Sequence, residues 1–233
     1  MSNNPLQKFN DLLEKVDLVG YRKRYQPIKI VEMDLPKEIQ AVSLLYEIYW
    51  DKKMFVNFDE FYRIYLKLYK HKLEEFRKNK AFMCKNCFYR GLEARIYRTW
   101  ASIITQIHAA YVAESVFVSG TVRMSEALDR AGADFQVQYK KKTLNYQVKK
   151  ISFSREVRKE KPKSKQPLEG EFFDITYDVP SDSYFRNPKR KNGKYRLPYL
   201  RFKENKNLKR LPNGFVVFTP LIFEEKKKEI DAI

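Results

Sequence analysis

The chain has 233 residues, 43 % of them hydrophobic, which is enough for one compact domain with a substantial core. Its formal net charge is +18, and a folded chain this basic usually serves a polyanion: nucleic acid first and a membrane surface second, with a basic surface kept only for solubility as the third interpretation. No run approaches the ~20 apolar residues of a membrane span, and the N-terminus lacks the profile of a secretory signal. We therefore expect a cytoplasmic protein that does not bind a membrane.

The first part of the chain predicts helices. Apolar residues recur at helical spacing over 6–16, 38–50, 58–80 and 91–115, and the last of these segments is the clearest. Glu93 falls in its first two turns, where the helix dipole favours a negative charge. His108 lies beside an apolar stripe and is expected to be structural. Cys84 and Cys87 form one Cys-x-x-Cys pair without a histidine at zinc-finger spacing, so two reduced thiols are favoured over zinc.

Short strands follow in the second half of the chain. They are expected at 116–118, over the hairpin 132–149 and its continuation to about residue 157, at 172–179 and at 215–218, with one or two helical turns over 124–130. This order predicts an α/β or α+β fold, in which helices flank a central mixed β-sheet and an N-terminal helical layer packs on it.

The hairpin is the most informative segment. Its two runs alternate apolar and polar residues, and a lysine-rich turn over 140–143 separates them. Symmetric pairing about this turn places Asp134 opposite Lys149 and Gln136 opposite Gln147. Because side chains two apart share a face of a strand, all four are expected on one side of the hairpin.

These side chains suggest a metal-assisted reaction at a phosphate. Mg²⁺ prefers hard oxygen ligands and keeps several waters, so Asp134, the backbone carbonyl of Val148 and the amide oxygen of Gln147 could hold the ion. Lys149 would then contact the phosphate or orient the attacking water. A solvated hairpin with mixed charges explains the same residues without any chemistry.

The surroundings of the hairpin resemble a known nuclease core. An acidic residue on a preceding helix, an Asp on one strand and a Gln-x-Lys on the next resemble the PD-(D/E)XK nuclease superfamily. Residues 25–36 (YQPIKIVEMDLP) and 94–102 (ARIYRTWAS) resemble the N-terminal segment and central helix of the TaqI-type restriction endonucleases. Asp129, Asp134 and Gln147-Val148-Lys149 fall where that family's active site would lie. The likeness covers most of residues 10–155.

The resemblance implies a type II restriction endonuclease with a PD-(D/E)XK nuclease-like core. Such an enzyme would be a Mg²⁺-dependent homodimer that cuts double-stranded TCGA after the T, while a cognate DNA methyltransferase acts on the same site without direct contact. Asp134 would be the metal ligand and Lys149 the catalytic lysine. Gln147 would replace the usual acidic residue, so Glu93 or Asp129 could supply the missing carboxylate.

The C-terminal third is strongly basic and rich in aromatic residues. Lysine and arginine recur between Arg186 and Arg210 against a single acid, Glu204. We assign DNA contacts to Lys150, Ser152, Ser154, Arg155, Arg186, Arg190, Lys191, Arg196 and Arg201. Because arginine often binds guanine through two hydrogen bonds, the last four arginines are candidates for base recognition, although phosphate contact is the more ordinary role of each one.

These expectations divide the chain into a helical subregion (1–85) packed on the core, a nuclease core (86–180) and a basic DNA-contacting region (181–233), within one structural unit. Two other functions fit the same features. One is a structure-specific nuclease of repair or recombination, which cuts without a sequence rule. The other is a basic nucleic-acid-binding protein without catalysis, whose binding weakens steeply with salt.

Overall fold

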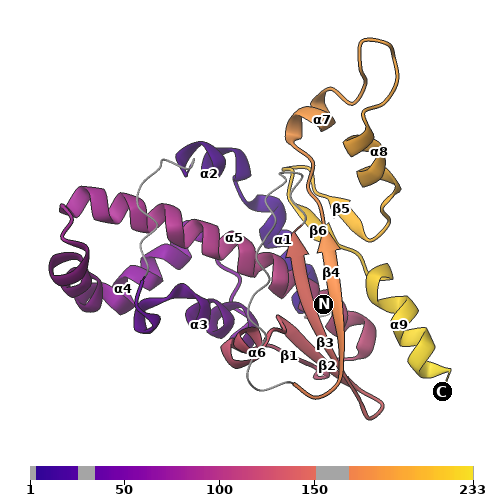
Figure 1. Ribbon diagram of the computed structural model, residues 1–233, viewed down its shortest axis with the longest axis horizontal. Helices are drawn as coiled ribbons and strands as arrows, with labels where there is room; N and C mark the ends of the chain where they lie inside the picture. Colours follow the sequence, from indigo (N-terminus) through magenta and orange to yellow (C-terminus); the bar gives the residue numbers. More distant parts are fainter. Residues whose placement is uncertain (1–3, 26–34, 151–167, 233) are drawn as a thin grey trace. The chain divides into compact units, whose positions relative to one another are not determined.

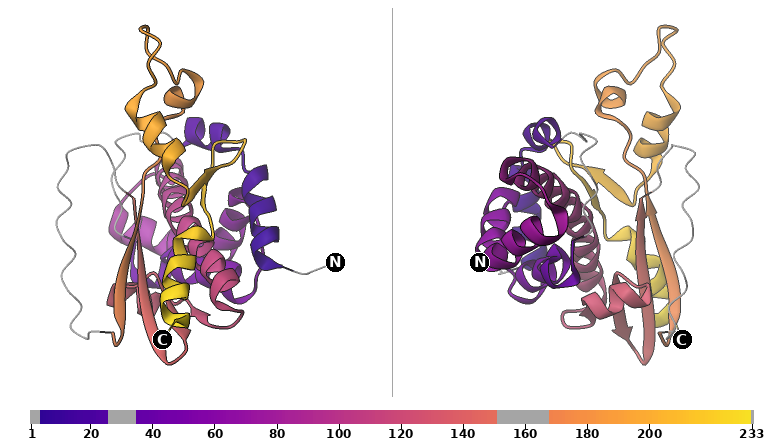
Figure 2. Two further views of the ribbon diagram at one scale, coloured as in Figure 1. Left: turned by 90° about the vertical axis from the view of Figure 1, so that its right-hand side faces the viewer. Right: turned by 60° about the vertical axis from the view of Figure 1, so that its left-hand side comes forward.

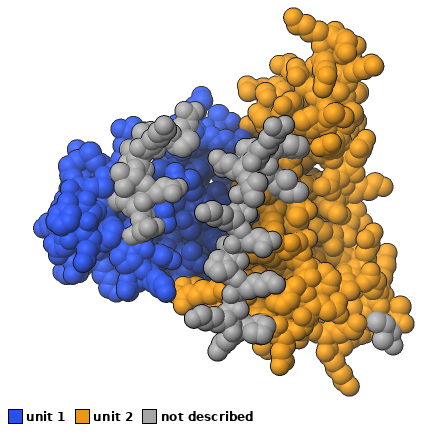
Figure 3. Space-filling model, viewed as in Figure 1, with its two compact units in different colours: residues 1–107 blue, residues 108–233 orange. Residues whose placement is uncertain are grey.

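The computed structural model describes residues 4–25, 35–150 and 168–232. The chain forms two compact units, residues 1–107 and 108–233, which are coloured separately in Figure 3. Helix α5 (Lys85–Phe117) contributes residues to both. Within the described ranges, no helix is both long and apolar enough to cross a membrane.

The first unit is helical, as the periodicity predicts (Figure 1). Before α5 it contains α1 (Pro5–Lys15), α2 (Leu18–Arg24), η1 (Lys37–Ile39), α3 (Ala41–Leu45), η2 (Tyr46–Asp51), α4 (Phe58–Phe76) and η3 (Arg77–Ala81). The four predicted helical segments are confirmed, although the segment 38–50 is divided between η1, α3 and η2. Helix α5 begins at Lys85 rather than near residue 91, so Glu93 does not lie in its first two turns.

Aromatic side chains form the core of the first unit. Phe58, Phe61 and Tyr65 recur on one face of α4 and are fully buried. Two buried aromatic side chains also form hydrogen bonds there. The Trp100 Nε1 donates to the Tyr49 hydroxyl at 2.8 Å, and the Tyr65 hydroxyl donates to the backbone carbonyl of Ile39 at 2.6 Å. These bonds tie α5 and α4 to the shorter helices.

The second unit holds a four-stranded mixed sheet of order β1-β2-β3-β4. Its elements after α5 are β1 (Val122–Arg123), α6 (Glu126–Ala131), β2 (Phe135–Tyr139), β3 (Lys142–Lys150), β4 (Glu171–Tyr177), α7 (Asp182–Arg186), α8 (Leu197–Glu204), β5 (Leu208–Arg210), β6 (Val216–Phe218) and α9 (Leu221–Asp231). β3 pairs antiparallel with β2 and parallel with β4, while β5 and β6 form a separate hairpin. The predicted mixed sheet is therefore confirmed.

The strand expected at 116–118 is wrong. Phe117 ends α5, and its buried ring contacts Tyr139 and Phe223. This side chain continues the buried stripe of the helix, so helical packing overrides the β propensity of Val116, Phe117 and Val118.

The predicted register of the hairpin is also wrong, by two residues. Gln136 pairs with Asn145 rather than Gln147, because Lys140 and Lys141 form a two-residue turn with φ values of 44° and 64°. Two adjacent residues with positive φ match the twist of a tight hairpin. Since the shift is even, the alternation of the paired residues is preserved, and the Gln136 amide donates across the strands to the Asn145 side-chain oxygen at 2.9 Å.

Helix α9 packs on the apolar face of this sheet (Figure 2). The Phe223 ring contacts Phe135 and Tyr146, which stack on each other across the hairpin. At the end of α9, Asp231 accepts a hydrogen bond from the Tyr139 hydroxyl at 2.8 Å. The opposite face of the hairpin carries the polar side chains, and there the candidate site lies.

Candidate active site

Asp134 lies at the end of the β2–β3 pairing, one residue before β2 begins. The residue is 4 % exposed, and its amide donates to the carbonyl of Tyr146 at 2.8 Å. Its Oδ2 accepts the amide of Val148 at 2.6 Å. The carboxylate thus occupies the position at which a backbone carbonyl would continue an antiparallel pair. This geometry places Asp134 across from Gln147, not from Lys149 as the symmetric pairing predicts.

The carbonyl of Val148 points toward the same side of β3 as its amide, because both groups of a strand residue face the same neighbouring strand. That side is occupied by Asp134. The carboxylate of Asp134 and the backbone carbonyl of Val148 are therefore directed toward the same side of β3.

Lys149 contacts a carboxylate that the sequence analysis missed. Its Nζ lies 2.5 Å from Oδ2 of Asp174, with the two side chains 44 % and 54 % exposed. Asp174 pairs with Gln147 in the parallel β3–β4 register, so Gln147 and Asp174 share a face. The signal for Asp174 in the sequence was weak, because parallel pairing joins strands that are far apart in the chain and leaves no local pattern.

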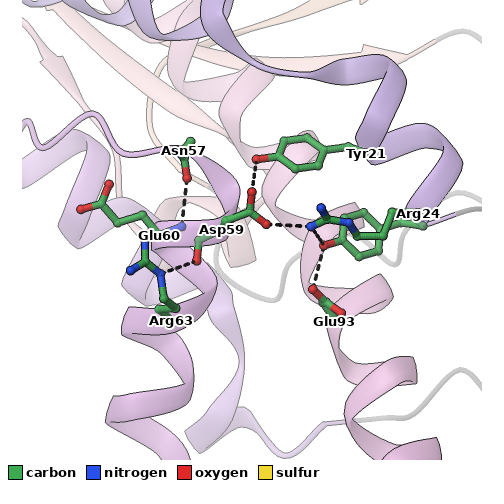
Figure 4. A network of polar contacts seen from close by, with 8 residues as sticks. Tyr21, Arg24, Asn57, Asp59, Glu60, Arg63 and Glu93 are labelled. Carbon is green, nitrogen blue, oxygen red and sulfur yellow. Dashed lines mark hydrogen bonds and ion pairs between the residues drawn. The ribbon is translucent and has the colours of Figure 1, made fainter.

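Glu93 belongs to the first unit, where it takes part in a polar network (Figure 4). The Tyr25 hydroxyl donates to its Oε1 at 2.8 Å, and Arg24 donates to that hydroxyl at 3.2 Å. Arg24 also pairs with Asp59 at 2.9 Å. The ordinary explanation for Glu93 is thus this network rather than the helix dipole, and a role beside Asp134 stays a prediction.

Asp129 lies in the second unit, half-buried on α6. The Ser125 side chain caps this helix, and Gly132 ends it with a φ of 99°. Only Gly132 and Ala133 separate the last residue of α6 from Asp134. The short connection places both aspartates in one segment, and a shared role at the site stays a prediction.

The predicted DNA contacts fall in three places. Lys150 is exposed at the end of β3; Ser152, Ser154 and Arg155 lie outside the described residues. Arg186, Arg190, Lys191 and Arg201 are exposed on α7, on α8 and in the turn between them. Arg196 differs from these, because its Nε donates to the carbonyl of Asn187 at 3.0 Å and its guanidinium lies 6.0 Å from the centre of the Tyr184 ring.

Neither His108 nor the cysteine pair forms a second site. His108 is buried, its Nδ1 accepts the amide of Phe218 at 3.4 Å, and burial lowers its pKa to about 3. Cys84 and Cys87 are free and exposed. No cluster of three or more His, Cys, Asp or Glu side chains suited to a metal ion occurs in residues 4–25, 35–150 and 168–232.

Comparisons with known proteins identify the family. A family model described as TaqI restriction endonuclease matches residues 6–229. Type II restriction enzyme TthHB8I from Thermus thermophilus is 33 % identical over 221 residues, which cover 91 % of this chain and 83 % of the relative. Type II restriction enzyme TaqI from Thermus aquaticus is 32 % identical over 222 residues, with the same coverage. No solved structure matches the chain. The chain therefore belongs to the TaqI restriction endonuclease family, whose members are site-specific deoxyribonucleases.

Proposed function

We propose that the chain cuts double-stranded DNA at a short palindrome, TCGA, after the T, with a PD-(D/E)XK-like centre at Asp134 and Lys149. The contact that carries the proposal is the Asp134 carboxylate held by the Val148 amide, directly before Lys149. Family membership supports the reaction class, and the resemblance of the chain to the TaqI-type endonucleases supports TCGA as the recognition sequence.

The donor groups fit Mg²⁺. Asp134 offers a carboxylate, Val148 a backbone carbonyl on the same side of β3, and Gln147 a neutral amide oxygen, which are the hard ligands that this ion prefers. When bound, Mg²⁺ would polarise the scissile phosphate and lower the pKa of a coordinated water. Gln147 brings no charge, so a second carboxylate is needed from elsewhere, and Glu93 and Asp129 are the candidates that the sequence offers. Asp174 is a third candidate, because it lies across from Gln147.

The protein's own groups position the substrate. The Val148 amide fixes the orientation of the Asp134 carboxylate in a buried position, where it does not need to reorganise during the reaction. The Lys149 ammonium can donate to a phosphate oxygen and stabilise the charge that develops on it. In the absence of DNA, Asp174 keeps this ammonium on the Gln147 face of the sheet.

We further propose that the active enzyme is a homodimer. A palindromic site has two-fold symmetry, and two identical subunits related by the same symmetry would present one centre to each strand. The cognate methyltransferase would protect the same sequence without contacting this protein.

Digestion of a defined plasmid with Mg²⁺ separates the proposal from its alternatives. A site-specific endonuclease gives discrete fragments. A smear, or preference for branched DNA, would favour a repair or recombination nuclease. Binding that weakens steeply with salt and leaves the plasmid intact would indicate a nucleic-acid-binding protein without catalysis.

A further inference from the structure

Residues 188–196, here called the finger, form a short two-stranded ribbon between α7 and α8. Lys189 bridges to Tyr195, and on either side the amide of Arg190 donates to Lys194 and that of Arg196 donates to Pro188, both at 2.8 Å. Gly193 closes the turn by donating to the carbonyl of Arg190 at 3.0 Å, with a φ of 77° that favours glycine. The backbone of the finger is therefore defined by its own hydrogen bonds.

The base of the finger is held by aromatic packing. Tyr195 stacks on Tyr199 with ring centres 5.5 Å apart, and Phe185 of α7 packs against Phe202 of α8 at 5.2 Å. Arg210 of β5 lies 4.5 Å over the Phe185 ring and pairs with Asp182 at 3.2 Å. These contacts join α7 and α8 to the β5–β6 hairpin, so the finger is a supported projection.

The tip of the finger is strongly cationic. Lys189, Arg190, Lys191 and Lys194 are all exposed, and no acidic residue occurs between Asp182 and Glu204. The two arginines at its base have structural roles, because Arg196 binds the carbonyl of Asn187 and Arg210 binds Asp182. Arg190 is the arginine placed at the turn itself.

The finger projects from the edge of the sheet that carries the candidate site. β3 and β4 are parallel, so their carboxyl ends, with Lys149 and Lys150, lie at one edge, and α7 follows β4 directly (Figures 1 and 2). Asp178 lies between β4 and α7. Burial raises the pKa of its carboxyl, and the positive charges of Lys150 at the end of β3 and Arg201 on α8 lie near enough to oppose that rise. A duplex bound at the site would therefore extend along the side from which the finger rises.

We propose that the finger enters the major groove of the DNA substrate, where Arg190 contacts a guanine and the neighbouring lysines contact flanking phosphates. The major groove is about 12 Å wide and admits a two-stranded ribbon, and an arginine fork matches the O6 and N7 acceptors of guanine. Phosphate contacts set position, whereas the base contact sets sequence preference. The inference rests on the proposed function, because it assigns part of the sequence recognition of that reaction.

The test compares three variants that each lose one positive charge: Arg190→Ala and Lys191→Ala in the finger, and Lys228→Ala on α9 as the matched control. Lys228 is exposed on α9, and this helix lies apart from α7 and α8 (Figure 1). Dissociation constants are measured with Ca²⁺ in place of Mg²⁺ on two short duplexes, one containing the sequence that the wild type cuts and one lacking it. The readout is the specificity ratio, which is the dissociation constant of the duplex without the site divided by that of the duplex with the site. A second series replaces the guanine of the site with 7-deazaguanine, which lacks N7.

Arg190→Ala should lower the ratio about 5- to 150-fold, the discrimination of one good arginine–guanine contact. Lys191→Ala should weaken both duplexes equally, and Lys228→Ala should leave the ratio unchanged. Wild type should bind the 7-deazaguanine duplex more weakly than the natural duplex. Arg190→Ala should bind the two duplexes equally. An unchanged specificity ratio in Arg190→Ala would overturn the proposed role of the finger, and so would an equal loss of affinity for the 7-deazaguanine duplex in wild type and Arg190→Ala. In either case, discrete plasmid fragments from the wild type would still support the proposed function. A wild type that cuts no DNA would overturn the proposed function itself.

Discussion

Asp134 combines burial with charge. A buried carboxylate is costly unless it is hydrogen-bonded, and the Val148 amide at 2.6 Å offsets part of that cost. A neutral side chain could accept the same bond at a lower cost, so the acid is better explained by chemistry than by stability. Lys149, the next residue after Val148 on β3, brings the positive charge that a phosphate would require.

Neutralising either residue should abolish most of the activity. Asp134→Asn keeps an oxygen that can accept the Val148 amide, and Lys149→Ala removes only a half-exposed ammonium, so both variants should fold. We expect each to slow single-turnover cleavage at least about 100-fold, as loss of an electrostatic catalytic contact does, while DNA affinity changes little. Lys142→Ala, at the other end of β3, is the control and should cut normally. Wild-type rates in either site variant would show that the centre lies elsewhere.

Asp174→Asn tests the contact between β3 and β4. Both partners of the Lys149–Asp174 pair are about half exposed, so its loss should lower the free energy of unfolding by no more than about 1 kcal/mol. If Asp174 positions the ammonium, single-turnover cleavage should fall about 10-fold. Asp174→Glu, which keeps the charge, should recover part of the rate. A normal cleavage rate in Asp174→Asn would show that the Lys149–Asp174 pair is an ordinary surface ion pair without a role in cleavage.

His108 predicts a pH dependence of stability. Its folded pKa of about 3 lies below the ordinary value of about 6.5, so the unfolded state binds more protons between these values. The contribution of neutral His108 is therefore complete above pH ~6.5 and is lost as the pH falls, by about 1.4 kcal/mol per unit. Urea unfolding from pH 7 to 5 should show this slope in His71→Gln, which changes the exposed histidine, but not in His108→Asn. Equal slopes in both variants would exclude His108 as the source.

At the scale of elements, the hairpin turn sets which residues meet. Lys140 and Lys141 both have positive φ, a conformation that costs a non-glycine residue about 1 kcal/mol or more. Both side chains are exposed, and Lys140 forms an ion pair with Asp231 at 2.8 Å. This ion pair offsets part of the backbone strain of the turn.

Lys141→Gly should stabilise the second unit. Glycine adopts positive φ without steric cost, so we expect the free energy of unfolding to rise by about 0.5–1 kcal/mol. Lys141→Val, which adds a β-branched side chain at the same position, should lower it. Chemical unfolding measured on both variants checks the prediction, and the opposite order of stabilities would contradict the assigned turn.

The sequence predicted features that depend on local periodicity. The four helical segments and the two-sided hairpin follow from apolar spacing, and the even shift in register left the alternation of the paired strands unaffected. The start of α5 was missed because residues 85–90 add only one buried side chain, Phe88, to the apolar stripe that continues at Leu92, and a single turn is too short to predict from periodicity. Asp174 was missed because its pairing with Gln147 joins strands separated by a long stretch of chain. The turn position was missed because four consecutive polar residues offer several equivalent turns.

At the scale of the molecule, positive charge and sequence recognition have different origins. A net charge of +18 attracts any nucleic acid, since phosphate neutralisation is independent of sequence. Discrimination requires a supported element that reaches base edges, and the finger between α7 and α8 has that form. Family membership indicates the reaction class, and the proposed catalytic centre consists of Asp134 together with Val148 and Lys149 of β3.

Sequencing the ends of DNA fragments tests the central claim most directly. Defined plasmid DNA is incubated with Mg²⁺ and either wild type or Lys149→Ala, and both strands of every fragment are read at their ends. We predict that every wild-type end lies within TCGA, between T and C, and that Lys149→Ala yields almost no ends. Wild-type ends that share no sequence, or the same yield of ends from Lys149→Ala, would contradict a site-specific endonuclease that acts through this centre.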